Sequence, residues 1–417
     1  MGGRGVSVVR YLSMPLFGKP LEAVTENDLQ PIIAAGIAEN RIIEYKSALP
    51  GRRDEDKREF VKDVVSFANS AGGNIIYGMT ASDGIPNGFQ CLDGTVLDAE
   101  KLRLEQIIRS SVEPVIHGLK IQPVPLPNAG GSVLIVEVPR GLFGPHMIRG
   151  RGAFISRTSA GKMEMDFGEI RAAFVGAETA TNKLRDFHAE RTARLAGGDT
   201  LMPLEGQTVA VLHVLPLESF TPSFRCDLAR ITGNGTRALL EPRRVAYGWQ
   251  PRFSLDGFSV LFTSGVENRP HCAYVHVFRN GALEYVDSDL ETGLGPKTLR
   301  VGRFESTMLA ATAKFMRVQE VLGVRGPFFV FPSLLNAKGW KLFAHRRAHY
   351  EPDQRTVERE HLILPEVMLE NGNEDLEAAF RPSFDVLWNA CGWMRSFSYD
   401  EHGAFELSAE WRGILGQ

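Results

Sequence analysis

The stretch that decides the fold of the first half of the chain is "EFVKDVVSFANSAGGNIIYGM", residues 59–79. Its first part places apolar side chains on one helical face, at Phe60, Val61, Val64, Val65 and Ala68. This spacing predicts an amphipathic helix, which we expect Asp54 or Asp56 to cap and Gly72 to end. "NIIYGM" after the two glycines reads as a short buried strand.

The segments on either side of this stretch continue the alternation of helix and strand. "TENDLQPIIAAGIAEN" (25–40) has an apolar stripe at helical spacing, with Thr25 as its expected N-cap. "SVLIVEVP" (132–139) and "GAFISRTS" (152–159) read as two further strands, and Asp83-Gly84 is a turn pair. The fold class predicted from this order is α/β, a mixed α+β layer.

Length and composition indicate more than one domain. A chain of 417 residues with 43% hydrophobic content can bury more than one core. We expect a first α/β domain over 15–175, a linking helix and linker over 176–207, and a second mixed α/β domain over 208–417. The small and turn residues of "TARLAGGDTLMPLEGQ" (192–207) mark the exit from the linking helix.

Charge and cysteine content narrow the function classes. The net charge of −3 means that any nucleic-acid surface must be a local patch. The four cysteines are far apart and form no CxxC pair, which argues against a disulfide framework or a zinc cluster and fits a reducing cytoplasm. No apolar run approaches the roughly 20 residues of a membrane helix. We therefore expect a cytoplasmic protein that does not enter the membrane.

The segment "ENRIIEYK" (39–46) offers two acids as candidate metal ligands. Glu39 and Glu44 would lie ~140° apart on a helix and on opposite faces of a strand. They converge only if the chain changes conformation between them, as when a helix ends at Asn40 and a strand begins. Two such oxygen ligands suit Mg²⁺ or Mn²⁺. The alternative is a solvated helix end with a surface Glu–Lys pair.

Lys46 follows Glu44 by two residues, so on a strand both side chains point to the same side. Lys46 would there hold a phosphate or pair with the acid. A divalent ion at this place would neutralise the charge that builds up during phosphodiester cleavage.

Basic residues form two clusters. The first, at the start of the long helix, is interleaved with acids and reads as a solvated helix start: Arg52, Arg53, Lys57 and Arg58. The second is the predicted nucleic-acid contact, with a plain surface loop as the alternative: Arg149, Arg151, Arg157 and Lys162. Gly150 and Gly152 would let its backbone approach phosphates closely.

No motif indicates ATP binding. There is no G-x4-G-K-[ST] sequence, because "SAGKM" lacks both the spacing and the hydroxyl after Lys162. The pair Gly72-Gly73 is better explained as a helix C-cap that enters a strand.

Together, "E-x4-E-Y-K", "EFVKDVVSFANSAGGNIIYGM", "VLIVEVP" and "FISRTSAGK" resemble the Schlafen AlbA-type domain over residues 16–175. This family is also described as divergent AAA or as a putative DNA-binding domain, and the chain resembles its prokaryotic members. The resemblance implies an α/β nucleic-acid-binding module. In the vertebrate Schlafens, two such lobes form a cradle that cuts transfer and ribosomal RNA with three carboxylates and a divalent metal.

The resemblance also implies site residues. Glu39 and Glu44 match the first two acids of the nuclease members. The third acid is expected where this chain has Thr80 and Ala81, and the nearest acid is Asp83. The implied catalytic set is thus Glu39, Glu44 and Asp83 as metal ligands, with Lys46 beside them.

Three functions follow as alternatives. The first is a metal-dependent endoribonuclease acting on structured RNA such as tRNA, in antiphage or stress defence. The second is a catalytically inactive regulator that binds DNA or RNA, and the third is a protein-binding scaffold. RNA is favoured over DNA. Because the chain shows one copy of the lobe, we expect a homodimer, unless the second half supplies the missing wall.

The second half resembles segments that follow this domain in many prokaryotic relatives, and we interpret it as a sensor or an oligomerisation module. Asn280-Gly281 predicts a hairpin. His271, Cys272 and His276 are interpreted as packing residues rather than metal ligands. Aromatic residues near the end of the chain are expected to be core rather than a base-stacking platform: Phe384, Trp388, Trp393 and Phe397.

Overall fold

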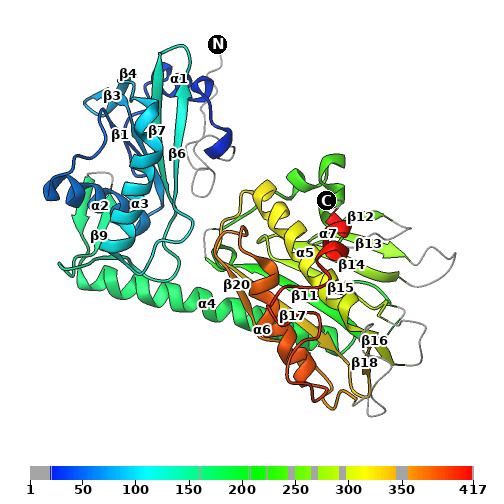
Figure 1. Cartoon of the computed structure of the whole chain (residues 1–417). Helices are drawn as coiled ribbons and strands as arrows, with labels where there is room; N and C mark the ends of the chain where they lie inside the picture. The colour runs from blue at the N-terminus through cyan, green and yellow to red at the C-terminus, as the bar shows by residue number, and fades with distance from the viewer. Residues whose placement is uncertain are drawn as a thin grey trace. The chain divides into compact units, whose positions relative to one another are not determined.

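A computed structural model gives the fold of two compact units, Met1–Ala180 and Thr181–Gln417. The structure describes Lys19 and residues 21–158, 161–204, 206, 208–221, 224–242, 249–263, 271–290, 297–343 and 356–415. Helix α4 (Phe167–Ala196) begins in the first unit and ends in the second (Figure 1). Both units combine helices with β-sheet, which confirms the mixed α/β fold class.

The first unit contains a four-stranded sheet in the order β1-β2-β7-β6. Its strands are β1 (Ile43–Lys46), β2 (Gly73–Tyr77), β7 (Gly131–Val138) and β6 (Lys120–Leu126). β1 and β2 are parallel and are joined through helix α2 (Asp54–Ala68), whereas the other neighbours are antiparallel. A parallel pair needs such a crossover connection, and the helix of the sequence "DEDKREFVKDVVSFA" supplies it.

Helices cover both faces of this sheet. Ile75 and Tyr77 of β2 pack with α2 and α3 (Leu97–Ser111), whereas Ile76 between them packs on the opposite side with α1 (Glu26–Ala34) and η1 (Leu21–Ala23). The alternation follows from the period of two in a strand. Because both faces are buried, the residues after Asn74 in "NIIY" are large and apolar or aromatic, which is why the sequence predicts a buried strand here.

The helix ends agree with the sequence in part. Thr25 caps α1 as predicted, with a capping box to Asp28, but this helix ends at Ala34. The predicted caps of α2 are wrong, since Arg53 is its N-cap and Asp54 its first residue. Gly72 lies just beyond α2 with φ 73°, the left-handed conformation that favours glycine after a helix.

Three two-stranded ribbons complete the first unit. β3 (Met79–Ser82) and β4 (Ile85–Phe89) form a hairpin on the predicted Asp83-Gly84 turn, and both turn residues have positive φ. The other ribbons pair β5 (Val112–Glu113) with β8 (Met147–Ile148) and β9 (Ile155–Thr158) with β10 (Gly161–Glu164). A short η2 (Gly94–Val96) precedes α3.

The second unit is built on one antiparallel sheet with the strand order β12-β13-β14-β15-β11-β17-β19, in which β20 also pairs with β17. Its strands are β11 (Val209–Pro216), β12 (Gln250–Phe253), β13 (Gly257–Thr263), β14 (His271–Phe278), β15 (Leu283–Asp287), β17 (Phe328–Leu335), β19 (Leu362–Ile363) and β20 (Val367–Leu369). The predicted hairpin at Asn280-Gly281 is confirmed, because it joins β14 to β15.

Helix α5 (Val301–Leu322) packs into the large core on one face of this sheet, and α6 (Leu376–Asn389) and α7 (Ser408–Leu415) pack against α5. Phe384 and Trp388 are buried in this core, and Trp393 and Phe397 pack partly buried against it, as predicted. The remaining elements are η3 (Leu217–Phe220), η4 (Leu228–Ile231), η5 (Asn234–Leu240) and the parallel pair of β16 (Thr298–Arg300) with β18 (Lys341–Phe343).

The other face of this sheet carries a row of polar side chains under the last turns of α4. Ser259, His276, Glu284 and His213 are consecutive cross-strand neighbours on β13, β14, β15 and β11. Arg191 of α4 binds both carboxylate oxygens of Glu284 at 2.8 Å. His276 is buried and hydrogen-bonds Ser259, so it packs in the core as the sequence indicates.

A helix that crosses a bilayer must be long and apolar. Within the part of the chain that the structure describes, none combines the length and the apolar character that crossing a bilayer requires.

Candidate nucleic-acid interface and buried charge network

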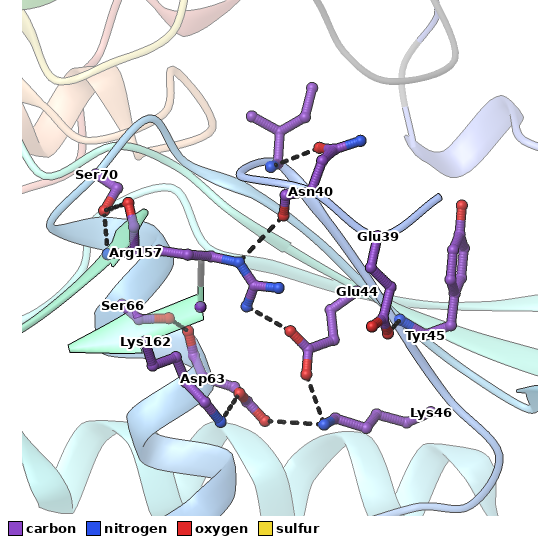
Figure 2. A network of polar contacts seen from close by, with 12 residues as sticks. Glu39, Asn40, Glu44, Tyr45, Lys46, Asp63, Ser66, Ser70, Arg157 and Lys162 are labelled. Carbon is purple, nitrogen blue, oxygen red and sulfur yellow. Dashed lines mark hydrogen bonds and ion pairs between the residues drawn. The ribbon is translucent and has the colours of Figure 1, made fainter. Parts of the chain in front are cut away.

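Glu44 lies at the centre of a charge network in the first unit (Figure 2). Strand β1 turns Ile43 and Tyr45 toward the α1 side of the sheet, so Glu44 and Lys46 point to the α2 side. Oε1 of Glu44 lies 2.6 Å from the Lys46 ammonium, and Oε2 contacts the guanidinium of Arg157. Both oxygens of this buried carboxylate are therefore paired with cations.

Asp63 of α2 extends the network. It is almost fully buried, and its Oδ1 accepts a hydrogen bond of 2.5 Å from Lys162 of β10. Lys46 lies 3.8 Å from Oδ2 of Asp63, and Lys162 also contacts Glu59. Figure 2 shows the Asp63 carboxylate between the two lysines. The network thus joins β1, α2 and the β9–β10 ribbon.

Arg157 of β9 is held by more than Glu44. Its Nε donates to the Asn40 carbonyl at 3.1 Å, and its guanidinium lies 4.6 Å from the centre of the Phe67 ring. Its backbone N–H donates to Ser70 Oγ at 2.7 Å. Only 8% of the Arg157 side chain is exposed. This arginine is therefore a fixed internal group, and not the surface contact that the sequence predicts.

The pKa values reflect this pairing. Burial opposes the charged form of Glu44, but the hydrogen bond and charge of Lys46 and the charge of Arg157 outweigh it, so the pKa of Glu44 is below its ordinary value. Burial likewise opposes the charge of Lys46, yet the charge of Asp63 and the contact with Glu44 raise its pKa. Glu44 and Lys46 therefore stay ionised at neutral pH.

Asp63 responds to its surroundings in the opposite direction. Burial, followed by the neighbouring negative charge of Glu44, raises the pKa of Asp63 above its ordinary value despite Lys46 and Lys162. The carboxylate of Asp63 thus depends on its two lysines for its charge, and each lysine is in turn held in place by it.

Glu39 and Asp83 lie apart from this network. The backbone N–H of Tyr45 donates to Oε1 of Glu39 at 2.9 Å, and the N–H of Glu39 donates to the Gly84 carbonyl at 2.7 Å. Asp83 is exposed in the β3–β4 turn next to Gly84. The backbone therefore brings Glu39 and the Asp83 turn together, while Glu44 faces Arg157 and Lys46.

Acidic side chains are the candidate ligands for Mg²⁺ or Mn²⁺ in this unit. Within the described ranges, no group of three or more His, Cys, Asp and Glu side chains is arranged to hold a metal ion. Glu44 and Asp63 are paired with lysine and arginine, and one oxygen of Glu39 accepts a backbone hydrogen bond. Glu39 and Glu44, two of the three predicted metal ligands, thus have different partners, and Asp83 is exposed in the β3–β4 turn.

Of the predicted basic cluster, Arg149 and Arg151 remain at the surface. Both are exposed in the turn between β8 and β9, which the hydrogen bond from the Ile148 N–H to the Ala153 carbonyl closes at 2.9 Å. Gly150 and Gly152 have φ of 78° and 64°, and no atom lies within 4 Å of where a Cβ would stand on either. This basic turn, residues 149–152, therefore presents two guanidinium groups and two glycines that no other part of the chain covers.

Asp63 and the polar residues that fix the β9–β10 ribbon are functional residues that the sequence does not predict. Asn69 Nδ2 donates to the His146 and Ile155 carbonyls at 2.8 and 2.9 Å, and Ser70 bonds Arg157. The signal for Asp63 is present in "EFVKDVVSF", where an acid occurs in the buried stretch of an amphipathic helix. A charged residue at such a place needs a partner.

Comparison with known proteins gives a match for one family. Residues 39–166 match the model of the family described as "Schlafen, AlbA_2". None of the curated proteins matches this chain.

Among solved structures, the crystal structure of the DIP2311 protein from Corynebacterium diphtheriae is similar to part of the chain. The identity is 18% and the TM-score 0.23, over 33% of this chain and 29% of that one.

The matched family model covers the charge network and the basic turn, since Glu44, Asp63, Arg149 and Lys162 all lie within its limits. Over residues 39–166 the chain is therefore similar to the Schlafen AlbA_2 domain, which points to a nucleic-acid-binding family.

Proposed function

We propose that the first unit binds nucleic acid through its phosphate backbone, and that the basic turn makes the contact. The observation that carries this proposal is the exposure of Arg149 and Arg151 on a glycine-flanked turn of a Schlafen AlbA_2 domain. Arg157 is buried and Lys162 is partly buried, and both are paired with acids of the chain, so we do not assign them to the contact.

The chemistry of the basic turn suits phosphate. A guanidinium group donates two parallel hydrogen bonds to phosphate oxygens, and glycine lets the main chain approach them closely. Arg149 is paired with Glu113 at 3.4 Å, but both side chains are about half exposed. Such a surface pair contributes little, and a phosphate can replace the carboxylate.

The ligand class follows from the kind of contact. Contacts to phosphates fix position but carry no base sequence, so binding is expected to be tolerant of sequence. We propose RNA rather than DNA as the ligand, and this choice rests on the family resemblance alone. The experiment below therefore includes both.

Fluorescence anisotropy with the full chain tests the proposal. Labelled single-stranded RNA, a stem-loop RNA and a DNA duplex of equal charge serve as probes. The double variant Arg149→Gln/Arg151→Gln should weaken binding to every probe by at least about ten-fold, since two phosphate contacts are lost. The matched control Arg52→Gln/Arg53→Gln removes two exposed arginines before α2 and should retain affinity. Equal losses in both variants would move the contact away from the basic turn.

Cleavage of structured RNA such as tRNA is the finer prediction, and it has a separate test. Total RNA is incubated with the intact chain in Mn²⁺ and compared with Glu44→Ala. Products that appear only with the intact chain would establish the nuclease, whereas intact RNA in both would leave a binding protein.

We also propose that the chain forms a homodimer, and this proposal rests on the resemblance to the Schlafen family. A single lobe offers half of the groove that two lobes make in the vertebrate Schlafens. Light scattering at micromolar concentration decides the point, because a mass near 46 kDa that does not change on adding RNA identifies a monomer.

A further inference from the structure

Each oxygen of Glu44 is in contact with a cationic side chain. Lys46 lies 2.6 Å from Oε1 and Arg157 contacts Oε2, and 9% of the Glu44 side chain is exposed. A carboxylate binds Mg²⁺ or Mn²⁺ through one of its oxygens, so that oxygen must face a position that no cationic side chain occupies. Here both oxygens already have positively charged partners from the chain itself.

The same is true of the second buried acid. Oδ1 of Asp63 accepts from Lys162 at 2.5 Å, and Lys46 lies 3.8 Å from Oδ2. Lys46 therefore stands between the two carboxylates of Glu44 and Asp63 (Figure 2). This is the position at which a divalent ion would bridge two acids.

The acids cannot hold a divalent ion and their present cationic side chains at the same time, because the positive charges would repel each other. A Mg²⁺ ion binds a carboxylate oxygen at about 2.0 Å, which would place it within a few ångströms of the nitrogen now bound to that oxygen. Two positive charges at that separation repel strongly in a partly buried site. The Arg157 guanidinium cannot leave easily either, because the Asn40 carbonyl and the Phe67 ring also hold it.

We propose that Lys46 and Arg157 take the place of a divalent cation beside Glu44, so that this unit binds nucleic acid without Mg²⁺ or Mn²⁺. Glu44 and Asp63 are then positioning residues, which fix the cationic side chains and through them the β9–β10 ribbon. The part that concerns nucleic acid rests on the proposed function, whereas the part that concerns the metal does not.

Metal binding is measured directly on the full chain. Mn²⁺ is titrated in, and the electron paramagnetic resonance signal of the free ion reports what the protein takes up. The wild-type chain is expected to bind no Mn²⁺ at its acidic network. In Lys46→Gln/Arg157→Gln, Glu44 loses both of its cations and Asp63 keeps only Lys162. Mn²⁺ affinity should therefore rise at least about ten-fold.

Matched controls separate this effect from a general loss of positive charge. Lys57→Gln and Arg53→Gln each remove a cation from an exposed ion pair at the start of α2, with Asp54 and Asp56 respectively. These variants should gain no Mn²⁺ site. Adding Glu44→Gln to the double variant should abolish the gained site, which places the ion at that carboxylate.

Circular dichroism shows whether each variant is folded. If the double variant is unfolded, the Mn²⁺ titration is done with Lys46→Gln alone. This variant is expected to fold, because the Lys46 side chain is 35% exposed and its loss leaves the Arg157 contacts intact. A folded variant that gains no Mn²⁺ binding contradicts the proposal. So does a wild-type chain that binds Mn²⁺ and loses it on Glu44→Gln.

Nucleic-acid affinity in EDTA and in Mg²⁺ completes the test. Equal affinity in the two buffers is the expected result, and a loss of affinity in EDTA that Mg²⁺ restores would overturn the proposal. A chain that binds no nucleic acid in either buffer would refute the proposed function, and the Mn²⁺ titration would still decide the metal question.

Discussion

The guanidinium of Arg157 rests against Oε2 of Glu44, and more than nine-tenths of each side chain is buried. This pair fastens the β9–β10 ribbon to strand β1 of the central sheet, to which the ribbon has no strand pairing of its own. Since neither group can be hydrated in the folded unit, each depends on the other for its charge to be tolerated. The pair is therefore a condition for the local fold.

Removing the charge of Glu44 should destabilise the first unit. Glu44→Gln keeps the shape of the side chain but leaves Arg157 without its carboxylate, so we expect a loss of about 3 kcal/mol in the free energy of unfolding. Urea denaturation measures this. Glu55→Gln, at an exposed position of α2, is the control and should change the value by less than about 0.5 kcal/mol. A Glu44→Gln variant as stable as the control would show that the pair is dispensable.

The pair of Arg191 and Glu284 should be equally important in the second unit. Glu284 is fully buried and also accepts hydrogen bonds from Tyr274 at 2.9 Å and from His213 at 3.0 Å. Glu284→Gln is expected to cost about 3 kcal/mol and to speed amide hydrogen exchange in residues 181–196 of α4.

The control for this variant is Glu190→Gln. Glu190 is exposed on the same helix and lies 3.9 Å from Arg194, so its loss should cost at most about 1 kcal/mol. Exchange in α4 that is as slow in Glu284→Gln as in Glu190→Gln would mean that apolar packing alone holds this helix to the sheet.

Many of the helices, strands and turns can be predicted from the sequence, because each depends on the pattern of a few adjacent residues. The buried strand "NIIY", the helix before it and the Asp83-Gly84 turn each carry their own signal within a few residues. The same holds for the Asn280-Gly281 hairpin and for the apolar burial of Phe384 and Trp388.

The partners of the charged residues could not be predicted, because they are set by tertiary contacts. Nothing near Arg157 in the sequence shows that it will meet Glu44 and Asn40, and Lys162 meets Asp63 from equally far along the chain. The spacing of Glu44 and Lys46 predicts that Lys46 binds either a phosphate or the neighbouring acid. In the structure Lys46 pairs with Glu44. Arg149 and Arg151 are exposed in the structure, as their place in a turn with glycines indicates.

Glu305 should give the second unit a characteristic dependence of stability on pH. Burial raises the pKa of Glu305 to about 7, although Ser398, Trp388 and Ser396 donate hydrogen bonds to its carboxylate. In the unfolded chain its pKa is near 4.5. Between these values the folded state holds a proton that the unfolded state has lost, so stability falls as pH rises through this window.

The expected loss between about pH 4.5 and about pH 7 is near 3 kcal/mol from this one group. Glu305→Gln carries no titrating proton and should remove that part of the pH dependence. Urea denaturation of both proteins at about pH 5 and about pH 8 isolates the contribution as a difference. Parallel pH profiles for the two proteins would show that Glu305 does not titrate in this range.

The salt dependence of binding shows most directly whether the basic turn contacts phosphates. The slope of log affinity against log salt reports the number of phosphates neutralised, at about 0.7 to 0.9 for each. Arg149→Gln/Arg151→Gln should reduce the slope by about 1.5 for RNA of any sequence, and Arg52→Gln/Arg53→Gln should leave it unchanged. An unchanged slope in Arg149→Gln/Arg151→Gln would contradict the account.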